Sequence, residues 1–73
     1  MSYQVLAPMA GSIWKIEVTE GDPVNETSVL IVMESMKMEV PVTAPVAGRV
    51  ASIAVAEGAS VQEDDLLLVL DSK

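Results

Sequence analysis

The chain has 73 residues, just over half of them apolar, with 11 acidic against 4 basic side chains and a formal net charge of −7. This composition predicts one small folded domain over residues 1–73, near the lower size limit for a self-sufficient hydrophobic core. The acidic excess has the wrong sign for binding nucleic acid through its phosphates. There is no cysteine and no histidine, which excludes disulfides, thiolate zinc sites and imidazole-based catalysis. We therefore predict no catalytic residue, no metal site and no enzyme activity from this chain alone.

Targeting signals are weak throughout the sequence. No apolar run approaches the length of a membrane span, and the first nine residues lack a basic region before an apolar block. We therefore expect no membrane insertion and a cytoplasmic location.

Short apolar segments separated by turn signals predict a chain made of strands. In chain order, residues 1–6 suit an edge strand, and residues 12–18 a partly alternating strand with Trp14, Ile16 and Val18 on one side. Residues 28–34 and 65–71 are continuous apolar runs, and residues 49–55 are a second β-branched run. Turn glycines flank these segments, namely Gly11, Gly21, Gly48 and Gly58. The pattern favours an all-β fold, a small antiparallel β-sandwich or flattened barrel.

An internal repeat organises these segments. A shift of 37 positions aligns residues 7–36 with residues 44–73 without a gap, and 13 of the 30 pairs are identical. The identical pairs are Ala7/Ala44, Pro8/Pro45, Ala10/Ala47, Gly11/Gly48, Ile16/Ile53, Val18/Val55, Glu20/Glu57, Gly21/Gly58, Val24/Val61, Glu26/Glu63, Leu30/Leu67, Val32/Val69 and Ser35/Ser72. Neither copy is long enough to bury its own apolar face, so we expect the two to pack about a pseudo-two-fold axis.

Lys37 lies in the short segment that joins the two copies, within "VMESMKMEVPV" at residues 32–42. One strand ending near Glu34 and another starting near Met38 leave only a tight turn, so Lys37 is predicted at a hairpin tip. The chain termini are then expected at the opposite end of the molecule. A lysine at such a tip is most often a solvated residue that opposes aggregation. Two methionines beside a tight turn cannot both be deep in a core, and their exposure favours recognition of this lysine instead.

The segments "ESMKMEVPVTAPVAGRV" and "APMAGSIWKIEVTEGDPV" resemble the biotinyl domain of biotin carboxyl carrier proteins and biotin-dependent carboxylases. The resemblance covers residues 5–70. It implies a flattened β-barrel of two four-stranded sheets related by a pseudo-dyad, in agreement with the repeat. It also implies that a biotin protein ligase joins biotin to Lys37 as an amide. The domain would then carry a carboxyl group between a biotin carboxylase and a carboxyltransferase.

The resemblance assigns further roles around Lys37. Met36 and Met38 match the methionines that mark the site for biotin, and Glu34 matches an acidic residue that the ligase recognises. Three positions depart from the family pattern. Ser35 stands where alanine is common, and Thr27 and Asp64 stand where the family tends to have glycine. If both turns need φ > 0, Asp64 can adapt while β-branched Thr27 would be strained, which predicts a different shape for the first turn.

Two other functions remain open from the sequence. A lipoyl domain shares the fold and the hairpin lysine and serves acyl or aminomethyl transfer, but its lysine usually follows Asp and precedes Ala, unlike Lys37. The other is an unmodified β-domain that acts only as an interaction module.

Overall fold

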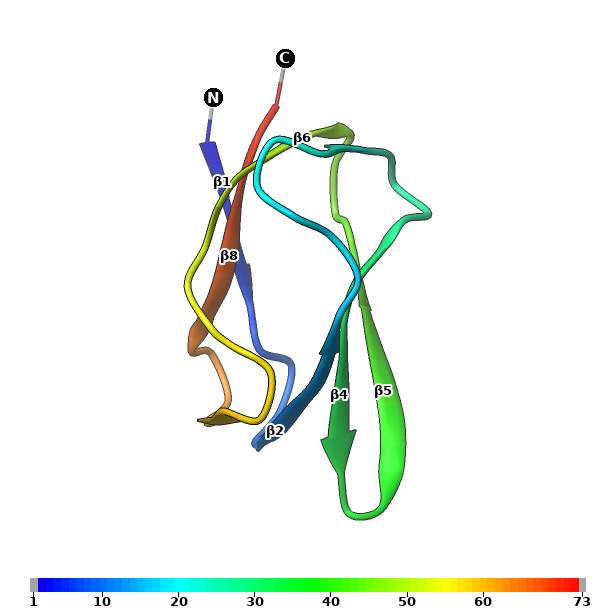
Figure 1. Cartoon of the computed structure of the whole chain (residues 1–73), viewed down its shortest axis with the longest axis vertical. Helices are drawn as coiled ribbons and strands as arrows, with labels where there is room; N and C mark the ends of the chain where they lie inside the picture. Colours follow the sequence, from blue (N-terminus) through cyan, green and yellow to red (C-terminus); the bar gives the residue numbers. More distant parts are fainter. Residues whose placement is uncertain (1, 73) are drawn as a thin grey trace.

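The computed structural model describes residues 2–72 as two four-stranded antiparallel sheets packed face to face (Figure 1). The strands are β1 (Ser2–Leu6), β2 (Gly11–Ile16), β3 (Pro23–Val24), β4 (Val29–Ser35), β5 (Met38–Thr43), β6 (Gly48–Ile53), β7 (Ser60–Val61) and β8 (Leu66–Asp71). One sheet has the order β1-β8-β6-β3 and the other β5-β4-β2-β7. The all-β prediction is confirmed, and so is the arrangement in two four-stranded sheets. Within residues 2–72, no helix has the length and apolar composition needed to cross a membrane.

The two copies of the repeat form the two sheets in the same register. In one sheet β4 of the first copy pairs with β5, for example Met33 with Val40. The equivalent pair in the other sheet is Leu70 with Tyr3, between β8 of the second copy and β1, the strand that precedes the first copy. Each sheet also takes a short strand from the other copy, because β7 pairs with β2 and β3 pairs with β6. The repeat therefore has the expected pseudo-two-fold relation, with the two copies interlocked rather than side by side.

Hydrogen bonds between the copies come in reciprocal pairs. The backbone N–H of Gly21 donates to the Val50 carbonyl at 2.7 Å, and that of Gly58 donates to the Ile13 carbonyl at 2.7 Å. Both glycines have left-handed backbone, with φ of 93° and 90°, a region that glycine enters without steric cost. Gly21 and Gly58 are thus turn glycines, as predicted.

Buried aliphatic side chains from both sheets form one core. The fully buried large side chains are Ile13, Leu30, Ile31, Met33, Val50, Leu67, Leu68 and Leu70. No polar or charged residue is buried among the described residues. The continuous apolar runs of the sequence are the central strands β4 and β8, which explains why they lack the alternation of a half-exposed strand.

The other two predicted turn glycines, Gly11 and Gly48, are not in turns but are the first residues of β2 and β6. A β-carbon on Gly11 would lie 2.6 Å from the Glu34 carbonyl oxygen, and one on Gly48 would lie 2.5 Å from that of Asp71. Both distances are shorter than a carbon and an oxygen can approach without displacing the backbone. Glycine is therefore required here by the close approach of two strands, and not by turn conformation.

The prediction that Trp14 shares a face with Ile16 and Val18 is wrong. A β-bulge shifts the register of β2 against β4 between Ile13 and Lys15, which interrupts the alternation of side chains. Ile13 enters the core, while Trp14 remains 54% exposed. The strand segments themselves were predicted within one or two residues at each end.

The two turns that depart from the family pattern differ in shape, as expected. Asp64 has φ of 71°, whereas Thr27 is not among the residues with positive φ. The Asp64 N–H donates to the Ala7 carbonyl at 2.9 Å, but the equivalent Thr27 N–H donates to Asn25 Oδ1 at 2.9 Å. The Thr27 hydroxyl donates to the same oxygen at 2.6 Å. In the first copy the Thr27 N–H is thus bonded to the Asn25 side chain. In the second copy the left-handed backbone of Asp64 is instead accompanied by a bond from its N–H to the Ala7 carbonyl.

Candidate functional site at the β4–β5 turn

Lys37 lies in the turn at the far end of the molecule from residues 2 and 72 (Figure 1). Strand β4 ends at Ser35 and β5 begins at Met38, and these two residues are the last pair of the ladder. Only Met36 and Lys37 remain for the connection. The predicted hairpin tip is confirmed. Residues 2 and 72 lie at the opposite end, as expected, whereas the terminal residues 1 and 73 lie outside the described residues.

Both residues of the turn have left-handed backbone, with φ of 52° at Met36 and 64° at Lys37. This is the pattern of a type I′ turn, whose twist matches that of the flanking strands and which normally takes Asn-Gly. Left-handed backbone costs about 1–2 kcal/mol for a residue with a β-carbon. The turn therefore holds two side chains at positions where glycine or asparagine would fold more easily, which indicates that the side chains themselves matter.

The Lys37 side chain is exposed and makes no hydrogen bond or ion pair with any described residue. The ion pair found on the described surface joins Lys15 to Glu17 at 4.0 Å. A primary amine without a protein partner can be approached by a second protein and acylated without breaking any contact in the fold.

The two methionines beside Lys37 are also outside the core. Met36 is 91% exposed and Met38 is 65% exposed. Exposed apolar side chains on both sides of a lysine are unfavourable in water and are typical of a surface that another protein covers. The positions confirm the predicted exposure, whereas recognition by a ligase stays a prediction.

Several contacts position the base of this hairpin. The Ser35 hydroxyl donates to the Ala10 carbonyl at 2.9 Å, so the serine that replaces the usual alanine connects β4 to the loop before β2. Gly11 allows β2 to approach the Glu34 backbone closely. Glu34 is paired directly with Glu39 across β4 and β5, and both side chains are exposed. Opposed like charges weaken a strand pair, so the two carboxylates are not explained by stability.

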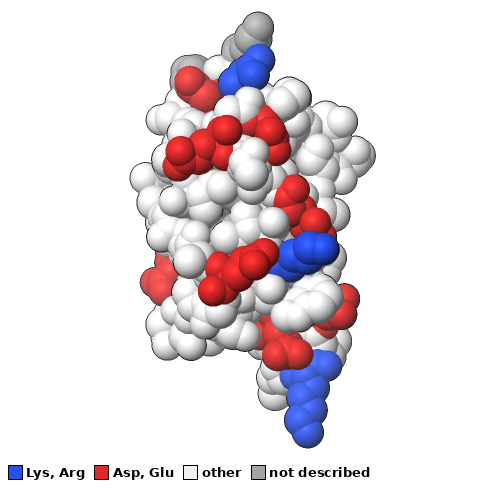
Figure 2. Space-filling model, viewed as in Figure 1, with Lys and Arg blue, Asp and Glu red and all other residues white. Residues whose placement is uncertain are grey.

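Charge is unevenly distributed over the molecule. Figure 2 shows acidic side chains over the viewed face and a basic side chain projecting at the hairpin end. Lys37 is thus a lone positive group on a tip whose base carries two carboxylates. Within residues 2–72, no group of three or more acidic side chains is arranged to hold a metal ion.

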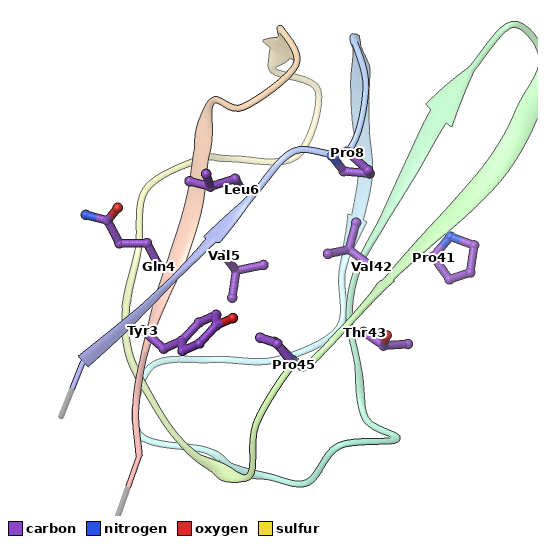
Figure 3. A pocket seen from close by; sticks show the side chains of 9 residues that line it. All are labelled: Tyr3, Gln4, Val5, Leu6, Pro8, Pro41, Val42, Thr43 and Pro45. Atoms are coloured by element: carbon purple, nitrogen blue, oxygen red, sulfur yellow. The ribbon is translucent and has the colours of Figure 1, made fainter.

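An uncharged groove of about 390 Å³ lies between β1 and β5 (Figure 3). Its lining comprises Tyr3, Gln4, Val5, Leu6, Pro8, Pro41, Val42, Thr43 and Pro45. None of these residues belongs to the β4–β5 turn, and none has a charged side chain. The groove is therefore separate from the turn that bears Lys37.

Sequence reasoning located the tip but did not predict its left-handed backbone. The available signal was the length of the connection, because two-residue hairpin turns are mostly of type I′ or II′. The bond from Ser35 to Ala10 was also missed, since it joins residues 25 positions apart.

Comparisons with known proteins agree with this geometry. The family model described as biotin-requiring enzyme matches residues 3–70. A homolog of the biotinylated protein TB7.3 from Mycobacterium leprae is 43% identical over 42 residues, which are 58% of this chain and 59% of that protein. A single-chain, multi-domain long-chain acyl-CoA carboxylase superposes with a TM-score of 0.93 at 30% identity, over 99% of this chain and 7% of that one.

A second solved structure, the urea carboxylase of Kluyveromyces lactis, superposes with a TM-score of 0.91 at 30% identity. That superposition covers 97% of this chain and 6% of the urea carboxylase. The chain thus spans just over half of its biotinylated relative and only a small part of each carboxylase. Because the family model covers nearly the whole chain, the chain belongs to the biotin/lipoyl family of biotin-requiring enzymes and is a biotinyl domain.

Proposed function

We propose that this chain is a biotin carboxyl carrier and that biotin is attached to Lys37. The observation that carries the proposal is the position of Lys37, an exposed amine without a protein partner in a two-residue hairpin turn between two exposed methionines. Attached biotin would supply a group that accepts a carboxyl group and gives it up again. The residues of the turn suit such a cofactor, because the lysine can lose its charge without leaving a buried partner unpaired.

Attachment requires one bond to form at Lys37. The amine, after losing a proton, attacks the activated carboxyl carbon of biotin, an amide forms and the activating group leaves. In this proposal a biotin protein ligase supplies both the activated biotin and the group that accepts the proton. Met36, Met38 and the Glu34 carboxylate are the groups of this chain that the ligase would read.

The hairpin then presents the modified lysine to two enzymes in turn. The molecule is elongated, with extents of 35 × 18 × 17 Å, and the turn lies at one end of the long axis (Figure 1). A tip on a narrow end can enter an active-site mouth that a flat surface cannot. We propose a biotin carboxylase and a carboxyltransferase as the partners, and the resemblance of the fold to parts of two carboxylases supports this. The carrier itself provides reach and effective concentration rather than catalysis. A cytoplasmic location stays a prediction.

The decisive experiment compares two lysine variants. The chain is produced with a biotin protein ligase and ample biotin, and its intact mass is measured. We expect one biotin adduct on the unmutated chain, none on Lys37→Arg, and one on the control Lys15→Arg, because Lys15 is a surface lysine on β2 rather than in the turn. An adduct that survives Lys37→Arg contradicts the assignment of the site. A lipoyl adduct in cells that also contain a lipoate ligase would favour the lipoyl alternative, and an unmodified mass contradicts both carrier functions.

A further inference from the structure

The four methionines within residues 2–72 differ sharply in exposure. Met36 is 91% exposed, Met38 65% and Met9 41%, whereas Met33 is fully buried in the core. Access of an oxidant to the thioether sulfur controls how fast a methionine is oxidised. The two most accessible methionines of the described chain are therefore those that flank Lys37, and the order of oxidation expected from the structure is Met36, Met38, Met9 and finally Met33.

We propose that Met36 and Met38 form a reversible oxidation site that controls whether Lys37 can be loaded with biotin. The oxidant is hydrogen peroxide or an organic hydroperoxide. The sulfur attacks one peroxide oxygen, the O–O bond breaks, the sulfur is oxidised to a sulfoxide, and the peroxide is reduced to water or an alcohol. Methionine sulfoxide reductases, one for each sulfoxide epimer, reduce the sulfoxide back to the thioether with two electrons from a thiol reductant, which becomes a disulfide while the oxygen leaves as water. This inference rests on the proposed function of Lys37.

The structure confines the effect of oxidation to the tip. Neither Met36 nor Met38 belongs to the buried core, so a sulfoxide at these positions displaces no packed side chain. Met33 is the opposite case, since a polar sulfoxide in the core would remain without a partner and destabilise the fold. A mild peroxide dose is therefore expected to modify the turn while the barrel stays folded.

The change in chemistry affects the surface that a ligase must cover. A thioether is apolar and flexible and suits a protein contact that buries it. A sulfoxide is polar, chiral and larger, and in an apolar contact it loses its water without gaining a partner. Because one such group stands on each side of Lys37, a protein that encloses the lysine meets at least one of them. The lysine amine itself is unchanged by the reaction.

The experiment treats the carrier alone with graded hydrogen peroxide, removes the peroxide with catalase, and then adds biotin protein ligase. Peptide mass spectrometry measures oxidation at each methionine, and intact mass measures biotinylation over time. We expect oxygen to appear first on Met36 and Met38. The ligase kcat/KM is then expected to fall about tenfold or more, the loss that follows when one large apolar contact is no longer made. Treatment with both reductases and a dithiol reductant should restore the initial rate.

Two variants serve as matched controls. The double variant Met36→Leu, Met38→Leu keeps apolar side chains of similar volume without sulfur, so its rates before and after peroxide should be equal, whatever its initial rate. Met9→Leu removes an exposed methionine outside the turn and should keep the full peroxide effect. A small N-hydroxysuccinimide ester should acylate Lys37 equally well before and after oxidation, which shows that the amine stays accessible.

Three results would overturn the proposal. These are an unchanged ligase rate after both methionines are oxidised, an equal loss in the double leucine variant, or oxidation of Met33 as fast as that of Met36. A chain that takes up no biotin before oxidation contradicts the proposed function and this inference together. Uptake before oxidation with unchanged uptake afterwards contradicts the inference alone.

Discussion

The two ends of the molecule are built from equivalent strands but differ in what joins them. At one end, β4 and β5 are connected by Met36 and Lys37. At the other end, the equivalent strands β8 and β1 pair in the same register without a connection, since they are the last and first strands of the described chain (Figure 1). The duplicated segments form most of the barrel. The turn is not duplicated, and its exposed Met36 and Lys37 side chains are not needed to hold the barrel together.

The duplication within this one chain distinguishes residues that the fold needs from residues that serve another role. Several residues that the fold requires occur twice, such as Gly11 with Gly48 and Leu30 with Leu67. The Met36-Lys37 turn occurs once and adopts left-handed backbone that is unfavourable for both residues. Its sequence is therefore not explained by stability, which supports a role in recognition.

The largest expected effect tests whether the two copies of the repeat contribute equally to the single core. Leu30 and Leu67 are both fully buried, and truncating either to alanine should lower the free energy of unfolding by about 2–5 kcal/mol, with similar losses in both copies. Urea denaturation followed by circular dichroism measures both values. A large loss in only one copy would show that the core does not depend equally on the two halves.

The next prediction distinguishes the two ends by function. Gly11→Ala and Gly48→Ala each place a β-carbon against a carbonyl oxygen of the neighbouring strand, and each should lower the free energy of unfolding by about 1–3 kcal/mol. Only Gly11→Ala displaces β4 beside Glu34 and Ser35, so only this variant should also slow biotinylation of the folded fraction. The ligase rate and the unfolding curve are measured on the same samples. Equal ligase rates in the two variants would contradict the link between Gly11 and the tip.

The third prediction concerns a substitution in the turn that should raise the stability of the fold and abolish its function. Lys37→Gly removes the β-carbon from a left-handed position and should raise the free energy of unfolding by about 0.5–1 kcal/mol. Lys37→Arg keeps the β-carbon and should leave stability unchanged within about 0.5 kcal/mol. Both variants should lose biotin completely. Thermal or urea unfolding of the unmodified proteins measures the difference, and a glycine variant less stable than the arginine variant would refute the strain at this turn.

The smallest expected effect concerns the two turns that lack the family glycine. Asp64→Gly relieves a left-handed residue and should stabilise the chain by about 0.5 kcal/mol. Thr27→Gly relieves nothing and removes the hydroxyl bond to Asn25 Oδ1, so it should destabilise the chain by about 0.5–1 kcal/mol. Opposite signs in precise urea titrations confirm that the copies differ here, and equal signs contradict it.

Structural features that depend on composition and on the internal repeat could be predicted from the sequence. The duplication, the long strands and the hairpin tip all follow from the 37-residue shift and the turn signals. The two-residue strands β3 and β7 were not predicted, because so short a segment has no periodicity. The exposure of Trp14 was missed because a bulge breaks the alternation from which its side was inferred. The reason for glycine at positions 11 and 48 lies in contacts with residues 34 and 71, far away in the sequence.

The interlocked arrangement of the copies also bears on how the chain folds. Strand β1 pairs with β8 across nearly the whole chain, and β2 takes its partner β7 from the other copy. These pairings form only after long loops have closed, which is slow and costs conformational entropy. The β4–β5 pair closes the shortest loop, two residues, so it has the smallest entropic cost of any strand pair in the molecule. The β4–β5 hairpin that bears Lys37 can therefore close with less dependence on the rest of the chain than any other strand pair within residues 2–72.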